Sequence, residues 1–151
     1  MNPFIYCPNL KEIRVSAAHP VFSVIGHALF DMPRKTLVCY PAGLGNCFYQ
    51  VPRGTDRIGA YAFYNCRSLR YVSLNTAATE IDAYAFAYCE DLQGMNLPER
   101  LAELGPNAFL NCGDVVFTVG KGAGAAKLLG ELGLAYEYEE LKETDPMLLP
   151  Y

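Results

Sequence analysis

Residues 92–112 read LQGMNLPERLAELGPNAFLNC, and the spacing of the apolar residues in this stretch recurs along the chain. The most regular part is an Ala-Phe pair with a cysteine three residues after the phenylalanine. It occurs at Ala62-Phe63 with Cys66, Ala85-Phe86 with Cys89, and Ala108-Phe109 with Cys112, each copy 23 residues after the last. Self-similarity at such a fixed period is typical of a solenoid, in which successive units stack and share one core.

The apolar spacing changes character within each unit. Val72 and Leu74 alternate with polar neighbours, which predicts a short strand, whereas Ile81, Ala85, Phe86 and Cys89 have a helix-like spacing. Each unit is therefore predicted to be a short strand followed by a helical turn or two. Stacking such units places their strands side by side and parallel.

The pattern in residues 92–112 resembles the BspA-like leucine-rich repeat, LxxLxLPxxLxxIGxxAFxxC. Two other units depart from it: Thr55 replaces a leucine in one, and Asn75, Ala78 and Asp82 replace the proline, leucine and glycine in the next. The resemblance implies an α/β repeat fold, a right-handed leucine-rich-repeat solenoid with parallel strands on one face, a β-hairpin insertion and a C-terminal capping helix.

We expect a single repeat domain over residues 1–136. A truncated first repeat is assigned to residues 4–15, because Phe4, Cys7, Leu10, Ile13 and Val15 reproduce the offsets of Phe63, Cys66, Leu69, Val72 and Leu74. Either the natural protein continues upstream or something atypical closes this end, since an uncapped solenoid exposes its core. Repeats are expected over 47–119 and a C-terminal cap, built on an Ala- and Leu-rich helix, over 120–136. The acidic tail, 137–151, is expected to be loosely ordered.

Between the first two repeats, residues 16–46 are expected to form the hairpin insertion. Residues 22–31 and 35–41 alternate like two strands around Met32-Pro33-Arg34. The segment Tyr40-Pro41-Ala42-Gly43 is similar to the end of the non-repeat hairpin in BspA-like arrays.

The composition is that of a folded protein without an affinity for nucleic acid. Of its 151 residues 52% are hydrophobic and 19% are charged, and a net charge of -4 offers no electrostatic footprint for phosphates. The first residues lack the features of a secretion signal, and no stretch has the eighteen or so apolar residues of a membrane span. The resemblance implies a secreted or cell-surface protein, while the missing signal leaves a cytoplasmic location open.

The cysteine pattern favours packing over metal binding. A period of 23 spreads Cys66, Cys89 and Cys112 along the stack, whereas zinc requires ligands that converge on one point. We expect a buried thiol ladder that is reduced, metal-free and slow to react. Cys39 and Cys47 are compatible both with a disulfide, if the protein is exported, and with free thiols.

Other motifs offer little chemistry. His19 and His27 are expected to be loop or edge residues, because no nucleophile motif accompanies them. The glycines of Gly120–Gly124 lack the spacing of a phosphate loop and are interpreted as the start of a helix. Eleven tyrosines raise the possibility of sugar binding, but the positions of Tyr61, Tyr64, Tyr84 and Tyr88 in the repeat favour packing on the convex side. No enzyme activity and no cofactor are expected.

The outward side chains of the strands are the candidate binding residues. If Val72 and Leu74 point into the core, Tyr71 and Ser73 point outward. The repeat offsets place in the same face Glu12, Arg14, Phe48, Gln50, Gly94 and Asn96. The resemblance implies a non-catalytic module that binds protein, of host or cell-envelope origin, in adhesion or recognition. The alternative is a structural or spacer segment of a longer bacterial surface protein.

Overall fold

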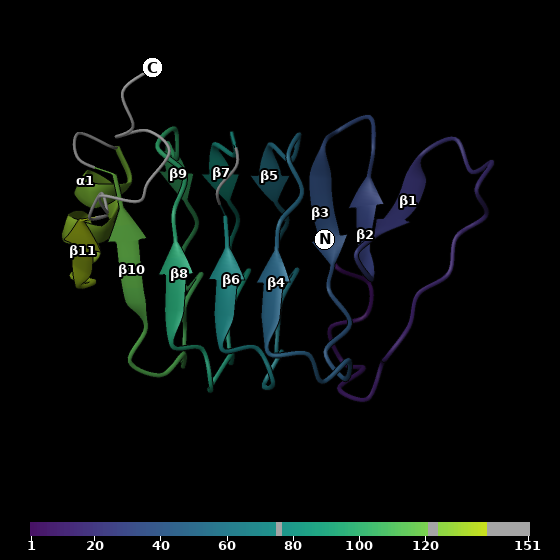
Figure 1. Cartoon of the computed structure of the whole chain (residues 1–151), viewed down its shortest axis with the longest axis horizontal. Coiled ribbons are helices and arrows are strands. Elements are labelled where there is room, and N and C mark those ends of the chain that lie inside the picture. Colours follow the sequence, from purple (N-terminus) through teal and green to yellow (C-terminus); the bar gives the residue numbers. More distant parts are fainter. Residues whose placement is uncertain (75–76, 121–123, 139–151) are drawn as a thin grey trace, which may run out of the picture.

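A computed structural model describes residues 1–74, 77–120 and 124–138. Over these ranges the chain forms a β-solenoid of about four turns with two rows of strands (Figure 1). The first row is a five-stranded sheet with the spatial order β11 (Tyr136–Tyr138), β10 (Val116–Val119), β8 (Gly94–Asn96), β6 (Tyr71–Ser73) and β4 (Phe48–Gln50). The second is a six-stranded sheet of β1 (Phe22–Ile25), β2 (Ala28–Asp31), β3 (Thr36–Cys39), β5 (Arg57–Ile58), β7 (Glu80–Ile81) and β9 (Glu103–Leu104).

The strand register follows the 23-residue period. Val72 pairs with Tyr49 on one side and Met95 on the other, and every pair in the five-stranded sheet is parallel. In the second sheet Ile58, Ile81 and Leu104 are aligned in the same way. The prediction of stacked units with parallel strands is confirmed.

The predicted helical turns within the repeats are wrong. After each short second strand the chain makes a series of tight turns, in which the left-handed region is occupied by Tyr61, Asn65, Tyr84, Tyr88, Asn107 and Asn111. A residue with positive φ interrupts a right-handed helix. Successive backbone N–H groups alternate instead between acceptors in the same coil and in the next one. Those of Ala62 and Tyr64 donate to the carbonyls of Gly59 and Tyr61 in the same coil, while that of Phe63 donates to the Ala85 carbonyl in the next coil. Backbone groups that a helix would pair internally thus join neighbouring coils.

A stack of aromatic rings runs through the core. Phe86 lies between Phe63, at 4.7 Å between ring centroids, and Phe109, at 5.5 Å, with all three rings nearly parallel. Tyr40 extends the stack, 5.4 Å from Phe63, and its backbone N–H bonds to Ala62 as that of Phe63 bonds to Ala85. Tyr40 therefore occupies the phenylalanine position of the preceding coil, although the sequence analysis assigned it to the insertion.

Replacing Tyr40 with phenylalanine is expected to stabilise the protein. The Tyr40 hydroxyl is buried and has no hydrogen-bond partner within the described ranges. An unpaired buried polar group costs about 1–3 kcal/mol, and phenylalanine keeps the ring in the stack. Urea unfolding should show a higher midpoint for Tyr40→Phe than for the parent protein. A lower midpoint would mean that the hydroxyl has a partner, such as a buried water.

The insertion contains three strands where two were expected. Gly26 and His27 both have positive φ and turn the chain between β1 and β2, so the expected strand over 22–31 is split into a hairpin. β2 then pairs antiparallel with β3, which pairs parallel with β5 and joins the solenoid. The Tyr49 hydroxyl donates to the carbonyl of Ile25 over 3.2 Å, so the hairpin lies against the end of the core.

The N-terminal segment reproduces half of a repeat. The turns Cys7 to Phe4 and Leu10 to Cys7 match those of Cys66 to Phe63 and Leu69 to Cys66. Residues 11–16, however, form no strand. Asn2 is buried, and its side-chain amide donates to the Tyr61 carbonyl over 2.9 Å. This bond attaches the N-terminal segment to the turn that follows β5.

At the other end, helix α1 (Gly124–Glu131) connects β10 to β11 and lies beside them in Figure 1. Ala125 and Leu129 are its buried residues. The helix is capped at its C-terminus by Gly133, which has a φ of 70°. The N–H groups of Gly133 and Leu134 donate to the carbonyls of Gly130 and Leu129. β11 extends the fold to Tyr138, beyond the expected boundary at 136, and residues 139–151 of the expected tail lie outside the described residues. In the part of the chain that the structure describes, no helix has the length and apolar character required to span a membrane.

Candidate functional site

The outward side of the five-stranded sheet presents two rows of side chains, which we call the strand face. Its residues alternate along the strands with the buried Tyr49, Val72, Met95 and Phe117. The register aligns one largely apolar row of Phe48, Tyr71, Gly94 and Val116. It aligns beside it a polar row of Gln50, Ser73, Asn96, Thr118 and Glu137.

The apolar row is exposed and partly preorganised. Phe48, Tyr71 and Val116 have exposed fractions of 51%, 39% and 45%, large values for apolar side chains in a folded protein. The Phe48 and Tyr71 rings are stacked at 5.9 Å with an angle of 15° between their planes. The Tyr71 ring extends over Gly94, because a Cβ atom on Gly94 would lie only 2.9 Å from Tyr71 Cδ2. Glycine at position 94 therefore leaves room for the ring.

The polar row is anchored at its centre. The Asn96 Oδ1 atom accepts a hydrogen bond from the Leu74 backbone N–H over 2.9 Å. This bond fixes the orientation of the Asn96 amide, which connects the end of β8 to the residue that follows β6. Among the residues of the two rows, Glu137 alone carries a charged side chain.

Five of the predicted binding residues lie together on this face, namely Phe48, Gln50, Tyr71, Ser73 and Asn96. Glu12 and Arg14 do not, because residues 11–16 form no strand and the five-stranded sheet ends at β4. They form an exposed ion pair with each other, Arg14 Nε lying 2.8 Å from Glu12 Oε1. That pair lowers the pKa of Glu12, first through its hydrogen bond to Arg14 and then through the charge.

Val116, Thr118 and Glu137 belong to the strand face but were not among the predicted binding residues. A step of 23 from Gly94 reaches Phe117, but the structure pairs Gly94 with Val116, so the last coil is one residue shorter at this point. Phe117 consequently points into the core. Residues 115–119 read VVFTV, in which only Thr118 is polar, so the sequence marks Thr118 as outward but gives no signal for Val116.

The tyrosines of the turns are less suited to stacking on a sugar. The Tyr61 and Tyr84 rings are 5.0 Å apart with only 6° between their planes, so each covers a face of the other. Tyr64 packs edge-on against Tyr88 at 5.4 Å, and the Tyr84 hydroxyl accepts a bond from Asn107 over 3.0 Å. A sugar ring requires a free aromatic face. These contacts therefore favour the packing interpretation of the four tyrosines.

The six cysteines are all free thiols, and all lie within the described residues. Cys66 and Cys89 are buried, and each donates to the carbonyl of the aromatic residue 26 positions earlier, Tyr40 and Phe63. Burial raises the pKa of Cys66, and that of Cys39 to about 12. Within the described ranges, no group of three or more His, Cys, Asp or Glu side chains is arranged to hold a metal ion.

Cys112 departs from the expected behaviour of the ladder. It is partly exposed, at the end of the row, and its thiol donates to the Phe86 carbonyl over 3.0 Å. The neighbouring Cys89 thiol lowers the pKa of Cys112, and Cys112 in turn raises the pKa of Cys89. The expectation that all three ladder thiols are buried is therefore wrong for Cys112, and the slow reaction of the ladder thiols stays a prediction.

Alkylation of the native protein should separate the cysteines by exposure. We expect iodoacetamide to label Cys7 and Cys47 fastest, then Cys112, with Cys39, Cys66 and Cys89 slower by at least about tenfold, because burial removes both access and thiolate. Quantifying the labelled peptides by mass spectrometry after short pulses gives the order. In urea all six should react at similar rates. Native labelling of Cys66 as fast as that of Cys47 would contradict the buried ladder.

The histidines and the glycine segment add no reactive group. The His19 ring accepts bonds from the backbone N–H groups of Val21 and Phe22 at 3.1 and 3.0 Å, which makes it part of a turn, and His27 is the second residue of the β1–β2 turn. Of the segment predicted to begin the helix, residues 121–123 lie outside the described residues, and α1 begins at Gly124.

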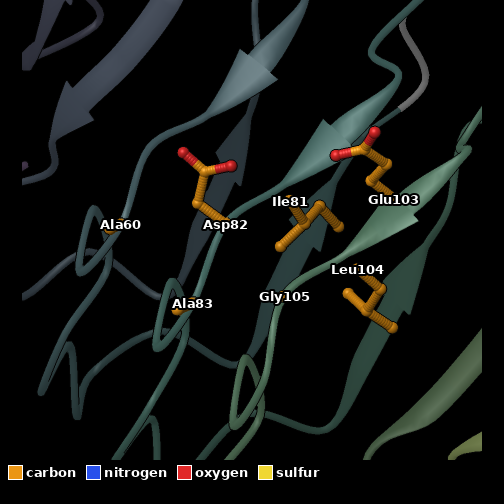
Figure 2. A pocket seen from close by; sticks show the side chains of 7 residues that line it. All are labelled: Ala60, Ile81, Asp82, Ala83, Glu103, Leu104 and Gly105. Atoms are coloured by element: carbon orange, nitrogen blue, oxygen red, sulfur yellow. The ribbon is translucent and has the colours of Figure 1, made fainter.

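A shallow hollow of about 530 Å³ lies over the second sheet (Figure 2). It exists because small residues, Ala60, Ala83 and Gly105, follow the short strands of three successive coils. Figure 2 shows the carboxyl groups of Asp82 and Glu103 on one side of it. Burial raises the pKa of Asp82, while Arg57, whose Nε lies 3.8 Å from Asp82 Oδ1, opposes that shift. The residues that line the hollow include no Ser, Cys, Thr, Lys or His, and Arg57 already pairs with the Asp82 carboxylate.

Two stacked sheets, a 23-residue register and an exposed strand face define a leucine-rich-repeat solenoid. Residues 46–119 match the family model described as "BspA type Leucine rich repeat region (6 copies)". The repeat region of this chain is therefore a BspA-type leucine-rich repeat. No curated protein matches the sequence.

Two solved structures are similar to the fold. The pneumococcal vaccine antigen PcpA superposes with a TM-score of 0.64 at 20% identity, over 73% of this chain and 33% of PcpA. A leucine-rich cell surface protein from Faecalibacterium prausnitzii A2-165 gives a TM-score of 0.47 at 18% identity, over 82% of this chain and 41% of its own. The chain thus spans a third of the length of PcpA, and at this identity the likeness concerns the fold.

Proposed function

We propose that the chain is a non-catalytic recognition module that binds a protein partner through the strand face. The observation that carries this proposal is the exposed apolar row of Phe48, Tyr71 and Val116 beside the polar row. Large apolar side chains flanked by groups that form hydrogen bonds resemble the central anchors and polar rim of a protein interface.

Tyr71 is the proposed principal anchor. Its ring stacks against Phe48 on one side and lies over Gly94 on the other. A side chain already fixed in one orientation loses less conformational freedom on binding, so more of the contact energy remains as affinity. Its hydroxyl adds a hydrogen-bonding group to a large apolar surface, the combination that makes tyrosine frequent among binding hot spots.

The size of the face indicates modest affinity for one copy. Five strands spaced about 4.8 Å apart span about 19 Å, which is at the small end of specific interfaces. Higher apparent affinity would come from several copies acting together. We propose a partner from a host or from the cell envelope and a location at the cell surface. The BspA-type repeat and the fold shared with PcpA support this location.

Tyr71→Ala is the variant that tests the face. Surface proteins of host cells and of bacterial envelopes would be captured on the immobilised chain, identified, and titrated against purified protein. We expect Tyr71→Ala to weaken binding about 10- to 30-fold, because it removes an anchor worth about 1.4–2 kcal/mol. Its melting temperature should remain that of the parent, since Tyr71 is exposed.

Two further variants control this test. Gly94→Ala should weaken binding in part, because the added methyl group displaces the Tyr71 ring without removing it. Tyr84→Ala changes a tyrosine of the turns and should leave affinity unchanged. Equal affinity for the parent, Tyr71→Ala and Gly94→Ala would move the site away from the strand face. Failure to retain any partner on the parent would favour a structural or spacer role in a longer surface protein.

A further inference from the structure

The cysteines of the repeats form a row that follows the stacking of the coils. The Sγ atoms of Cys66, Cys89 and Cys112 lie 3.7, 3.1 and 3.0 Å from the carbonyl oxygens of Tyr40, Phe63 and Phe86. Each acceptor is 26 residues before its donor, so the contact is the same in each coil. The cysteines therefore repeat with the spacing of the coils, which is about 4.8 Å for hydrogen-bonded backbones.

The last two members of this row are placed to form a covalent bond. The backbone around Cys89 is fixed to the next coil by bonds from Phe86 to Ala108 and from Tyr88 to Leu110, both 2.8 Å. The two sulfurs make equivalent contacts one coil apart, Cys89 with the Phe63 carbonyl and Cys112 with the Phe86 carbonyl, so they lie next to each other along the stack. Disulfides join residues whose Cα atoms are about 4.4–6.8 Å apart, a range that contains the coil spacing.

The pair also combines one accessible thiol with one protected thiol. Cys112 is partly exposed, whereas Cys89 has an exposed fraction of 0%. Cys66 and Cys89 are equally adjacent in the stack, but both are buried, so an oxidant in solution reaches neither. Redox-sensitive cysteines are typically accessible thiols next to a second, resolving cysteine. Of the three ladder cysteines, Cys112 has this arrangement, with Cys89 as the resolving residue.

We propose that Cys89 and Cys112 are an oxidisable thiol pair, which a hydroperoxide converts to a disulfide that joins two neighbouring coils. In the first step the Cys112 thiol loses its proton, the thiolate attacks the terminal peroxide oxygen and the O–O bond breaks, so that Cys112 becomes a sulfenic acid and the departing alkoxide or hydroxide takes up the proton as an alcohol or water. In the second step the Cys89 sulfur attacks the Cys112 sulfur. The S–O bond breaks, water leaves with the Cys89 proton, and the disulfide forms. The peroxide supplies the two oxidising equivalents, and both sulfurs share the loss of electrons.

The disulfide has a structural consequence that can be measured. It closes a loop of 22 intervening residues that includes β8 and β9, and so restricts the unfolded chain. The oxidised protein should therefore melt several degrees higher than the reduced protein. Addition of dithiothreitol should return the melting temperature to that of the reduced protein.

Peptide mapping after treatment with hydrogen peroxide tests the proposal directly. The full chain with Cys7→Ser and Cys47→Ser removes the two exposed competitors. Trypsin cleaves at Arg70, Arg100 and Lys121, so Cys89 and Cys112 lie on separate peptides, 71–100 and 101–121. We expect these peptides joined by a disulfide, at a rate proportional to peroxide and independent of protein concentration. With Cys112→Ser added, the joined peptides should disappear and Cys89 should stay reduced.

Three results would overturn the proposal. One is conversion of Cys112 to a sulfinic acid while Cys89 remains a thiol. Another is a joined product whose formation depends on protein concentration, which would mean a bond between molecules. The third is an oxidised protein with joined peptides but no rise in melting temperature, since the bridge would then not join coils of the folded solenoid. Cys112→Ser changes a partly exposed residue, so its circular dichroism spectrum should match that of the parent.

Discussion

Replacing Phe86 with alanine is expected to lower the free energy of unfolding by about 3–5 kcal/mol. Phe86 is fully buried in the central coil, with an exposed fraction of 0%. Its ring contacts Phe63 and Phe109 on its two sides, at 4.7 and 5.5 Å between centroids. Alanine removes the ring and leaves a cavity bordered by two coils. The backbone bonds of Phe86 to Ala108 and of Phe63 to Ala85 resist collapse of that cavity.

The expected loss is smaller for Phe109, which the sequence analysis places in the same repeat position. Phe109 is only partly buried and packs against Phe117 at 4.7 Å in the last coil. Urea unfolding of Phe86→Ala, Phe109→Ala and Phe48→Ala should give losses in descending order, with Phe48→Ala close to the parent because its ring is exposed. A Phe86→Ala midpoint equal to that of Phe48→Ala would refute the proposed aromatic stack.

The periodic part of the fold could be predicted from the sequence, because residues that are one repeat period apart come into contact when the coils stack. Positions 23 residues apart, such as Ile58 and Ile81, are paired in adjacent strands. What period cannot reveal is the backbone conformation between the paired positions. The spacing of Ile81, Ala85 and Phe86 fits a helix, yet Tyr84 and Tyr88 adopt positive φ and the chain turns instead. Asparagine is common in that region, and Asn65, Asn107 and Asn111 were a signal that pointed to turns.

The binding surface could be predicted where the repeat is regular and could not where it is interrupted. Tyr71 and Gly94 follow from alternation and offset, and the structure aligns them. The extrapolation failed for Glu12 and Arg14, because residues 11–16 form no strand and the five-stranded sheet ends at β4. It failed for Val116 because one residue fewer in the last coil shifts the register. A fixed offset therefore predicts which side chains share a row only where successive coils have the same length.

Replacing Gly105 with alanine is expected to destabilise the protein by about 1–3 kcal/mol, although it adds a single methyl group. A Cβ atom at this position would overlap the Ala83 backbone nitrogen and lie 2.6 Å from the Asp82 carbonyl carbon. Those atoms belong to the backbone of the preceding coil and cannot rotate away as a side chain could. The Gly105 N–H also bonds to the Ile81 carbonyl over 2.7 Å, so separating the coils to admit the methyl group weakens that bond too.

Gly130→Ala is the matched control, because the same change at that position should have the opposite sign. Gly130 lies in α1, and a Cβ atom there would meet nothing within 4 Å. Alanine is favoured over glycine inside a helix by about 0.5–1 kcal/mol, so Gly130→Ala should raise the unfolding midpoint while Gly105→Ala lowers it. Urea unfolding of both variants beside the parent separates two effects on stability. The lower backbone freedom of alanine affects both variants, whereas the steric overlap with a neighbouring coil affects only Gly105→Ala. If Gly105→Ala proved as stable as Gly130→Ala, the coils would not approach as closely at this position as the structure shows.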